Sequence, residues 1–118
     1  QAGAYVDGPL PLYNEYDGTF EDEDKSLAAA KALGGAKWAL LANHGSLVVG
    51  KDLRQAHLRV ATLEWRSQRA YELEQVGGGV PLTDEQVAEI ALPDAHGFPF
   101  LWEAMARREL REDSGIVD

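Results

Sequence analysis

Three histidines are the residues of this chain best suited to bind a metal ion, and His44 has the most informative surroundings. It lies in the run Asn-His-Gly-Ser-Leu-Val-Val at residues 43–49, directly after the apolar segment 38–42. Ligands collect at strand ends in α/β sheets, so a histidine at this place can offer a ring nitrogen to a metal ion. One ligand does not make a site, however, and a buried, hydrogen-bonded histidine is the structural alternative for His44.

The other two histidines have weaker claims to a functional role. His57 falls among apolar positions of a long predicted helix, where a packing or surface role is expected. His96 falls in a loop between two predicted helices, where most histidines are solvated. The sequence has no Gly-x-Ser-x-Gly and no His-Glu-x-x-His motif, so nothing supports a serine hydrolase or a zincin. It also has no cysteine, which excludes disulfides, thiolate metal sites and a cysteine nucleophile.

Short apolar runs predict the strands that position His44. Residues 37–42 are nearly all apolar, which is typical of a strand covered on both faces. After a turn at His44 and Gly45, residues 47–49 predict a second short strand. Residues 9–12 alternate proline with leucine and predict an extended, edge-like segment.

An acidic cluster at residues 21–24 stands at the head of a predicted helix. The helix runs to about Leu33 and stops at the glycine pair 34–35. Carboxylates near a helix N-terminus interact favourably with the helix dipole, so we interpret the cluster as a helix start and not as a cation site.

A long helix is predicted from the N-cap Asp52 toward Val76. One continuous packing face is expected at residues spaced by three and four: Leu53, Ala56, Val60, Leu63, Ser67 and Ala70. The arginines are expected on other sides, with Glu64 and Glu72 nearby for pairing: Arg54, Arg59, Arg66 and Arg69. At about 1.5 Å per residue the helix is roughly 37 Å long, so we expect its far end to meet another segment or subunit.

The last third of the chain predicts a hinge and two more helices. Residues 77–79 are three glycines without a preceding strand or a following Gly-Lys-Ser/Thr, so they form a hinge and not a phosphate loop. Thr83 and Gln86 form a capping box that starts a helix to about Ala91. Residues 98–110 predict a final amphipathic helix.

Length and composition bound the class of protein. The 118 residues fit one domain of an α/β protein, and a hydrophobic share of 45% is enough to build a core. A net charge of -9 argues against binding to nucleic acid or to an anionic membrane surface. The sequence lacks an initiator Met and the features of a signal peptide, so we expect a chain cut from a longer one. It also lacks an apolar run long enough to span a membrane, and we expect a cytoplasmic location.

Residues 40–50, with Asn-His-Gly at their centre, resemble the class II aldolase/adducin family in its C-terminal half. That family pattern continues into a long helix with alanine and Leu-Glu at offsets similar to Ala56 and residues 63–64. Residues 12–18 resemble the segment that precedes this pattern, and the resemblance covers about residues 1–92. It implies a three-layer α/β/α fold, of which residues 1–118 would be the C-terminal portion of a single domain.

The resemblance also implies a metal site. Members of the family bind Zn²⁺ or another divalent metal through three histidines, and His44 matches the third of them. The first two come from a His-x-His motif in the other half, and this chain has no such motif. The catalytic carboxylate and the phosphate-binding residues belong to that half as well, so the chain alone should have little activity.

The expected function is therefore a metal-dependent lyase that cleaves a small, sugar-like hydroxy-carbonyl compound by a retro-aldol step, through a metal-stabilised enediolate. Within the same class, a sugar-phosphate 4-epimerase working by the same step is the alternative. A non-catalytic, adducin-like interaction domain is the alternative from another class, and an unrelated α/β domain with a buried His44 is the fourth possibility. The resemblance further implies a homotetramer with sites at subunit interfaces.

Overall fold

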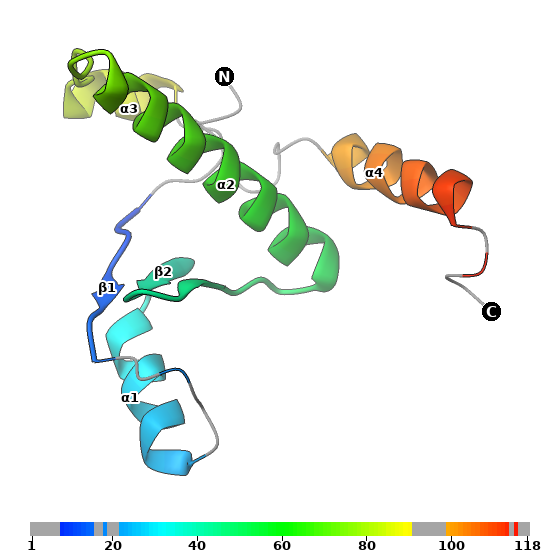
Figure 1. Cartoon of the computed structure of the whole chain (residues 1–118), viewed down its shortest axis with the longest axis horizontal. Coiled ribbons are helices and arrows are strands. Elements are labelled where there is room, and N and C mark those ends of the chain that lie inside the picture. Colours follow the sequence, from blue (N-terminus) through cyan, green and yellow to red (C-terminus); the bar gives the residue numbers. More distant parts are fainter. Residues whose placement is uncertain (1–7, 16–17, 19–21, 91–98, 114, 116–118) are drawn as a thin grey trace. The chain divides into compact units, whose positions relative to one another are not determined.

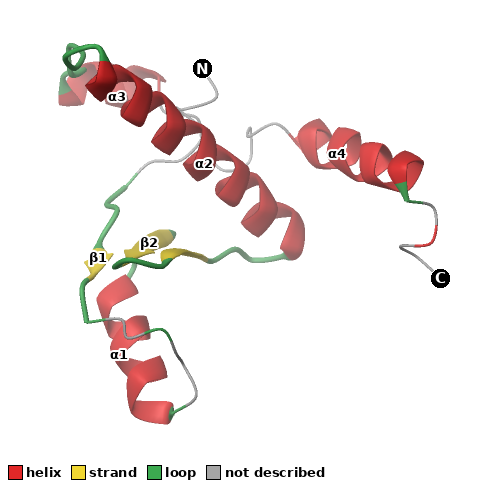
Figure 2. Ribbon diagram, viewed as in Figure 1, coloured by secondary structure: helices red, strands yellow, loops and turns green. Residues whose placement is uncertain are grey.

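The computed structural model describes residues 8–15, 18, 22–90, 99–113 and 115 (Figure 1). Among them it has seven elements in this order: β1 (Leu12–Tyr13), α1 (Glu23–Leu33), β2 (Trp38–Leu41), β3 (Gly45–Val48), α2 (Leu53–Gln75), α3 (Asp84–Ile90) and α4 (Pro99–Glu112). The chain divides into two compact units. The first, residues 8–51, contains the sheet and α1, and the second contains α2, α3 and α4 (Figure 2). The mixed α/β class expected from the sequence is confirmed.

The first unit is a three-stranded sheet in the order β1-β2-β3. β1 runs parallel to β2, with Leu12 opposite Leu40, and β3 runs antiparallel to β2, with Gly45 opposite Leu41. The second predicted strand, 47–49, in fact begins at Gly45 and ends at Val48. It starts earlier because Gly45 already pairs with Leu41, which confines the turn to residues 42–44.

α1 covers one face of this sheet. Tyr13, Ala29 and Leu41 are buried together, and Ala28, Ala32 and Leu47 pack against them. The small side chains of α1 let its backbone approach the sheet closely. Asp22 caps the helix, since its carboxylate accepts a hydrogen bond from the backbone N–H of Lys25 at 2.8 Å. Asp22 therefore acts as a helix start, as its place in the acidic cluster predicted, while Glu21 lies outside the described residues.

The opposite face of the sheet is covered unevenly. Trp38 is 1% exposed, but Leu40, two residues along the same strand, is 36% exposed. Leu12, which pairs with Leu40, is 58% exposed. The prediction that this strand is covered on both faces therefore holds at Trp38 and is wrong at Leu40. A third layer over this face stays a prediction.

α2 begins as the sequence predicts. The Asp52 carboxylate accepts a hydrogen bond from the backbone N–H of Gln55 at 2.8 Å. The helix ends at Gln75, and Gly77 and Gly78 follow with φ of 96° and 90°. The Gly78 N–H donates to the Leu73 carbonyl at 2.8 Å, so the glycines close the last turn as helix-terminating residues do.

The predicted packing face of α2 is wrong in large part. Leu63 is buried, but Leu53 and Val60 from the same predicted face are exposed. Leu58 and Arg59 are buried instead, and every residue from 64 to 75 is exposed. Apolar side chains lie on more than one side of this helix, so spacing alone does not decide which side is covered.

The two remaining helices follow the predictions closely. Thr83 and Gln86 form the predicted capping box before α3, with backbone-to-side-chain hydrogen bonds of 3.0 and 3.3 Å. α4 extends two residues beyond the predicted end at 110, where Arg108 and Glu112 form an i,i+4 ion pair at 2.9 Å.

No described helix combines the length and the apolar run that crossing a bilayer requires.

Candidate functional site

His44 lies in the tight turn that follows β2. Its backbone N–H donates to the Leu41 carbonyl at 3.1 Å, and Gly45 starts β3 immediately afterwards. The backbone at His44 is thus fixed on both sides, while the side chain is exposed. A buried histidine, the structural alternative, is contradicted by this exposure. The residue is therefore accessible from solvent.

Asn43 gives the turn its shape. It has a φ of 55° and is the one described non-glycine residue with positive φ. Asparagine tolerates this left-handed conformation better than most residues, because its short polar side chain can hydrogen-bond locally. A Cβ added to Gly45 would meet no atom within 4 Å, so the space beside the turn is open. Asn43 and Gly45 thus hold the His44 backbone in a narrow turn, and the space next to Gly45 is open.

The Asn43 conformation makes a prediction about stability. Asn43→Gly is expected to leave the free energy of unfolding nearly unchanged, because glycine adopts positive φ without strain. Asn43→Val is expected to lower it by about 1–3 kcal/mol, because a β-branched residue is strained there. Urea unfolding followed by circular dichroism measures both variants. Equal destabilisation by glycine and valine would contradict this account of the turn.

The donor set around His44 is incomplete within this chain. No group of three or more His, Asp or Glu side chains is arranged to hold a metal ion in the part of the chain that the structure describes. A neutral imidazole is a ligand that zinc prefers, but a catalytic zinc site takes three protein ligands. His44 is therefore a suitable type of ligand for such a site, but the described residues do not supply the other two ligands.

The other predicted residues are placed apart from His44 along the chain. His57 lies on α2, where its ring contacts Trp102 and Met105 of α4, so the predicted packing role is confirmed. His96 lies outside the described residues. Of the α2 residues that carried the resemblance, Leu63 is buried and Glu64 is exposed, so the first packs and the second faces solvent.

The arginines of α2 divide into different environments. Arg69 pairs with Glu72 at 2.7 Å, as the sequence predicts, whereas Arg54 pairs with Glu103 of α4 at 3.3 Å. Arg59 is only 6% exposed, although the sequence placed it away from the packing face. The sequence did not predict this burial. The aliphatic part of an arginine side chain can pack against apolar residues or lie in solvent, and the sequence does not show which.

A family model described as the class II aldolase and adducin N-terminal domain matches residues 1–71. This span is more than half of the 118 residues, and it contains the whole sheet, the His44 turn and most of α2. It is shorter than the resemblance read from the sequence, which reached about residue 92. No curated protein matches the chain. The match does not divide the domain into halves, so the assignment to the C-terminal half stays a prediction.

Proposed function

The chain belongs to the class II aldolase and adducin family, and on this premise we propose that it is part of a metal-dependent lyase. The proposed reaction is retro-aldol cleavage of a small hydroxy-carbonyl compound, such as a sugar phosphate. The observation that carries the proposal is the exposed His44 side chain on a fixed turn at the end of β2. Residues 1–118 would be the C-terminal portion of the domain, and we place the protein in the cytoplasm.

The place of His44 supports a ligand role better than a structural one. An exposed imidazole adds little to folding, because surface side chains contribute within about 0.5 kcal/mol of stability. A fixed backbone with an exposed imidazole at the end of a strand is instead an arrangement that suits metal coordination. Under the proposal, two further histidines from a segment outside these 118 residues complete the site.

The roles within this chain are limited and specific. A bound Zn²⁺ would polarise the substrate oxygens and favour carbon–carbon bond cleavage. His44 would supply one ring nitrogen, Asn43 would hold the turn, and Gly45 would keep the adjacent space open. The proton-transfer group and the phosphate ligands would come from outside this chain, so the 118 residues alone should have little activity.

A homotetramer is part of the proposal. The second half of α2 exposes the apolar side chains of Trp65, Tyr71 and Leu73, and most of the stability of a helix in a protein comes from packing against other elements. Contact with another subunit would cover this helix and stabilise it. The exposed apolar side chains of this half therefore suit an assembled protein better than a monomer.

Two alternatives remain within the family. A sugar-phosphate 4-epimerase would use the same bond cleavage, and His44 would then have the same role. A non-catalytic, adducin-like interaction domain would keep the fold without needing the imidazole. The exposed His44 favours the two enzymes, because a scaffold gains nothing evident from a histidine in this turn.

Chelation tests the proposed function in the full-length protein. We expect lyase activity on a panel of sugar phosphates to fall by about a hundredfold or more after treatment with a chelator, and to return with Zn²⁺. Magnesium, which prefers oxygen ligands, is the matched control and should not restore it. Exchange between 4-epimers without net cleavage would indicate the epimerase. Activity that persists without metal would contradict the proposal, and a full-length protein that binds no divalent metal and is inactive in both assays would favour the interaction domain.

A further inference from the structure

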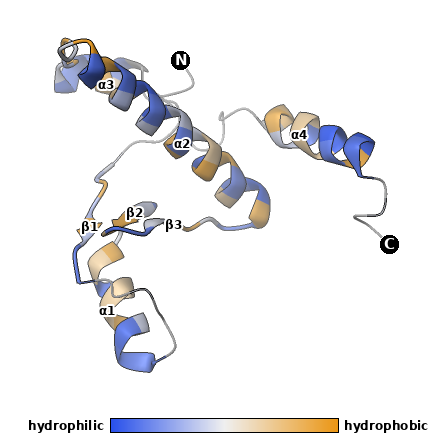
Figure 3. Cartoon of the chain, viewed as in Figure 1, coloured by the Kyte–Doolittle hydropathy of each residue, from blue (hydrophilic) through white to orange (hydrophobic). Residues whose placement is uncertain are grey.

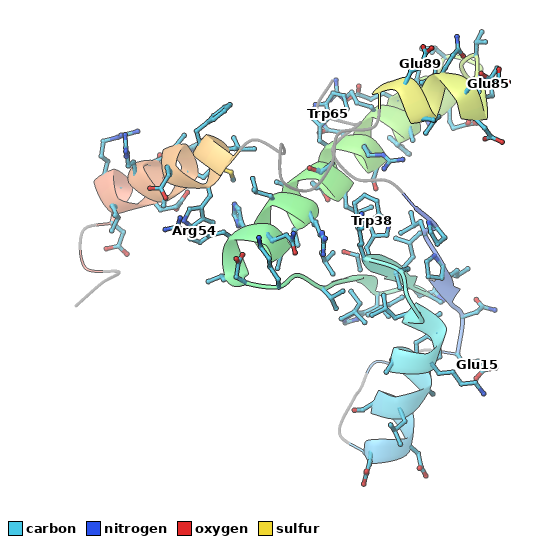
Figure 4. The ribbon with its side chains drawn as sticks, turned by 180° about the vertical axis from the view of Figure 1, so that it is seen from behind. Glu15, Trp38, Arg54, Trp65, Glu85 and Glu89 are labelled. Carbon is cyan, nitrogen blue, oxygen red and sulfur yellow. The ribbon has the colours of Figure 1, made fainter. Side chains whose placement is uncertain are left out.

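α2 and α4 are joined by a small cluster of side chains that the proposed function does not use. His57 on α2 lies against two residues of α4, Trp102 and Met105. One turn earlier on α2, Arg54 forms an ion pair with Glu103 at 3.3 Å (Figure 4 labels Arg54). Figure 3 shows that α4 is apolar over its first turns, where this contact lies, and polar toward its end.

The contact between His57 and Met105 brings two metal-binding atoms together. The imidazole Nε2 lies 3.3 Å from the thioether Sδ. In one tautomer the Nε2–H donates to the sulfur, which is a weak acceptor. In the other tautomer the proton is on Nδ1, and the lone pairs of nitrogen and sulfur face the same space. A cation between the two atoms would relieve that repulsion and bind both.

The third member of the cluster suits a cation as well. The Trp102 ring centroid lies 5.1 Å from the His57 ring centroid, with the planes 81° apart. A cation beside the imidazole would be within reach of the indole, and indole is the aromatic ring that attracts cations best. All three side chains are partly buried, so a bound ion would be partly shielded from water.

The donor types decide which ion is suitable. Thioether sulfur is a soft ligand and selects Cu(I), whereas carboxylate and carbonyl oxygens select Mg²⁺ and Ca²⁺. The ion pair of Arg54 and Glu103, which also joins α2 and α4, is mutually neutralised, so it neither repels a monovalent cation nor attracts a divalent one strongly. The sequence has no cysteine, so no thiolate within the chain competes for a soft ion.

We propose that His57, Met105 and Trp102 form a binding site for a soft monovalent metal ion, Cu(I), between α2 and α4. His57 binds through Nε2 and Met105 through Sδ, while the indole ring of Trp102 packs against the imidazole. The site is separate from the proposed zinc position, because it uses a different histidine and a thioether. Its occupation would fix α4 on α2, since the ligands come from both helices.

Silver(I) is the probe for this site, because it is a soft monovalent ion that needs no protection from oxidation. We expect the full-length protein to bind one Ag(I) at this site in native mass spectrometry, and the site to bind Ag(I) in preference to Zn²⁺. The ion is also expected to quench the fluorescence of Trp102. The quenching titration gives an apparent affinity for each variant that keeps Trp102, and native mass spectrometry at a series of Ag(I) concentrations gives it for Trp102→Phe.

Met105→Leu is the decisive variant, because leucine keeps the volume and the apolar character but removes the sulfur. It should weaken Ag(I) binding by about tenfold or more. His57→Phe should do the same while keeping the aromatic contact with Trp102. Trp102→Phe should weaken binding less, and Trp65→Phe, on the exposed half of α2, is the matched control that should leave it unchanged.

Thermal unfolding of each variant separates a lost ligand from a lost fold. Binding that falls in Met105→Leu while the melting temperature holds supports the site. Unchanged Ag(I) affinity in Met105→Leu would overturn the proposal, and so would equal losses in the Trp65→Phe control. The result does not depend on lyase activity, so it can fail or succeed separately from the proposed function.

Discussion

His44→Ala is expected to abolish the proposed lyase activity of the full-length protein, with a loss of about a hundredfold or more. A three-histidine site that loses one ligand holds its metal more weakly and leaves the remaining ligands badly oriented. The variant is assayed at limiting Zn²⁺, where weaker metal binding appears directly as lost activity. Excess Zn²⁺ should restore part of the rate if the remaining ligands still bind.

The same variant should leave stability almost unchanged. The His44 side chain is exposed, and alanine retains the hydrogen bond from the backbone N–H of residue 44 to the Leu41 carbonyl. We expect the free energy of unfolding to change by less than about 0.5 kcal/mol. A large loss of activity beside a small change in stability separates a metal ligand from a structural residue.

His57→Gln is the matched control for this experiment. It removes a second histidine of the chain but lies in the contact between α2 and α4, away from the His44 turn in the sequence. We expect it to retain the lyase activity at limiting Zn²⁺. Equal losses in both variants, or an active His44→Ala variant, would contradict the role assigned to His44.

Trp38→Ala is expected to destabilise the chain by about 3–5 kcal/mol. Trp38 is the largest fully buried side chain among the described residues, and it lies at the start of β2 (Figure 4). Its removal would leave a cavity beside the strand that leads to the His44 turn. Because small domains are stable by only about 5–15 kcal/mol, this loss would remove a large part of the free energy of unfolding.

Trp65→Ala is the control for Trp38→Ala, since it deletes the same atoms from an exposed position. Trp65 lies on the second half of α2 and is 44% exposed. We expect a smaller loss of about 1 kcal/mol or less in the monomeric chain. Urea unfolding at equal protein concentration compares the two variants. Similar losses would show that burial of Trp38 does not dominate the stability of the sheet.

Local sequence patterns predicted the elements that frame the candidate site. The apolar run ending at residue 42 predicted β2, and Asp52 predicted the start of α2 because a carboxylate there satisfies a free backbone N–H. The capping box at Thr83 was equally clear. These signals are local, since each depends on residues within one or two turns of chain.

Burial could not be predicted so well, because it depends on what lies opposite a residue. Leu40 and Trp38 lie on the same face of β2 but differ in exposure, and no local pattern separates them. Arg59 is buried although its type favours solvent. The partners of His44 could not be predicted for a related reason, since a metal site joins residues that are distant in the chain.

The most direct test of the central claim, that His44 is a ligand of a catalytic metal, is the metal content of the full-length protein. Elemental mass spectrometry of freshly purified, chelator-free protein should find about one zinc ion or other divalent metal per chain, as a single three-histidine site requires. The metal should be absent from His44→Ala and present in His57→Gln. A full-length protein without divalent metal, or a His44→Ala variant that keeps it, would contradict the account.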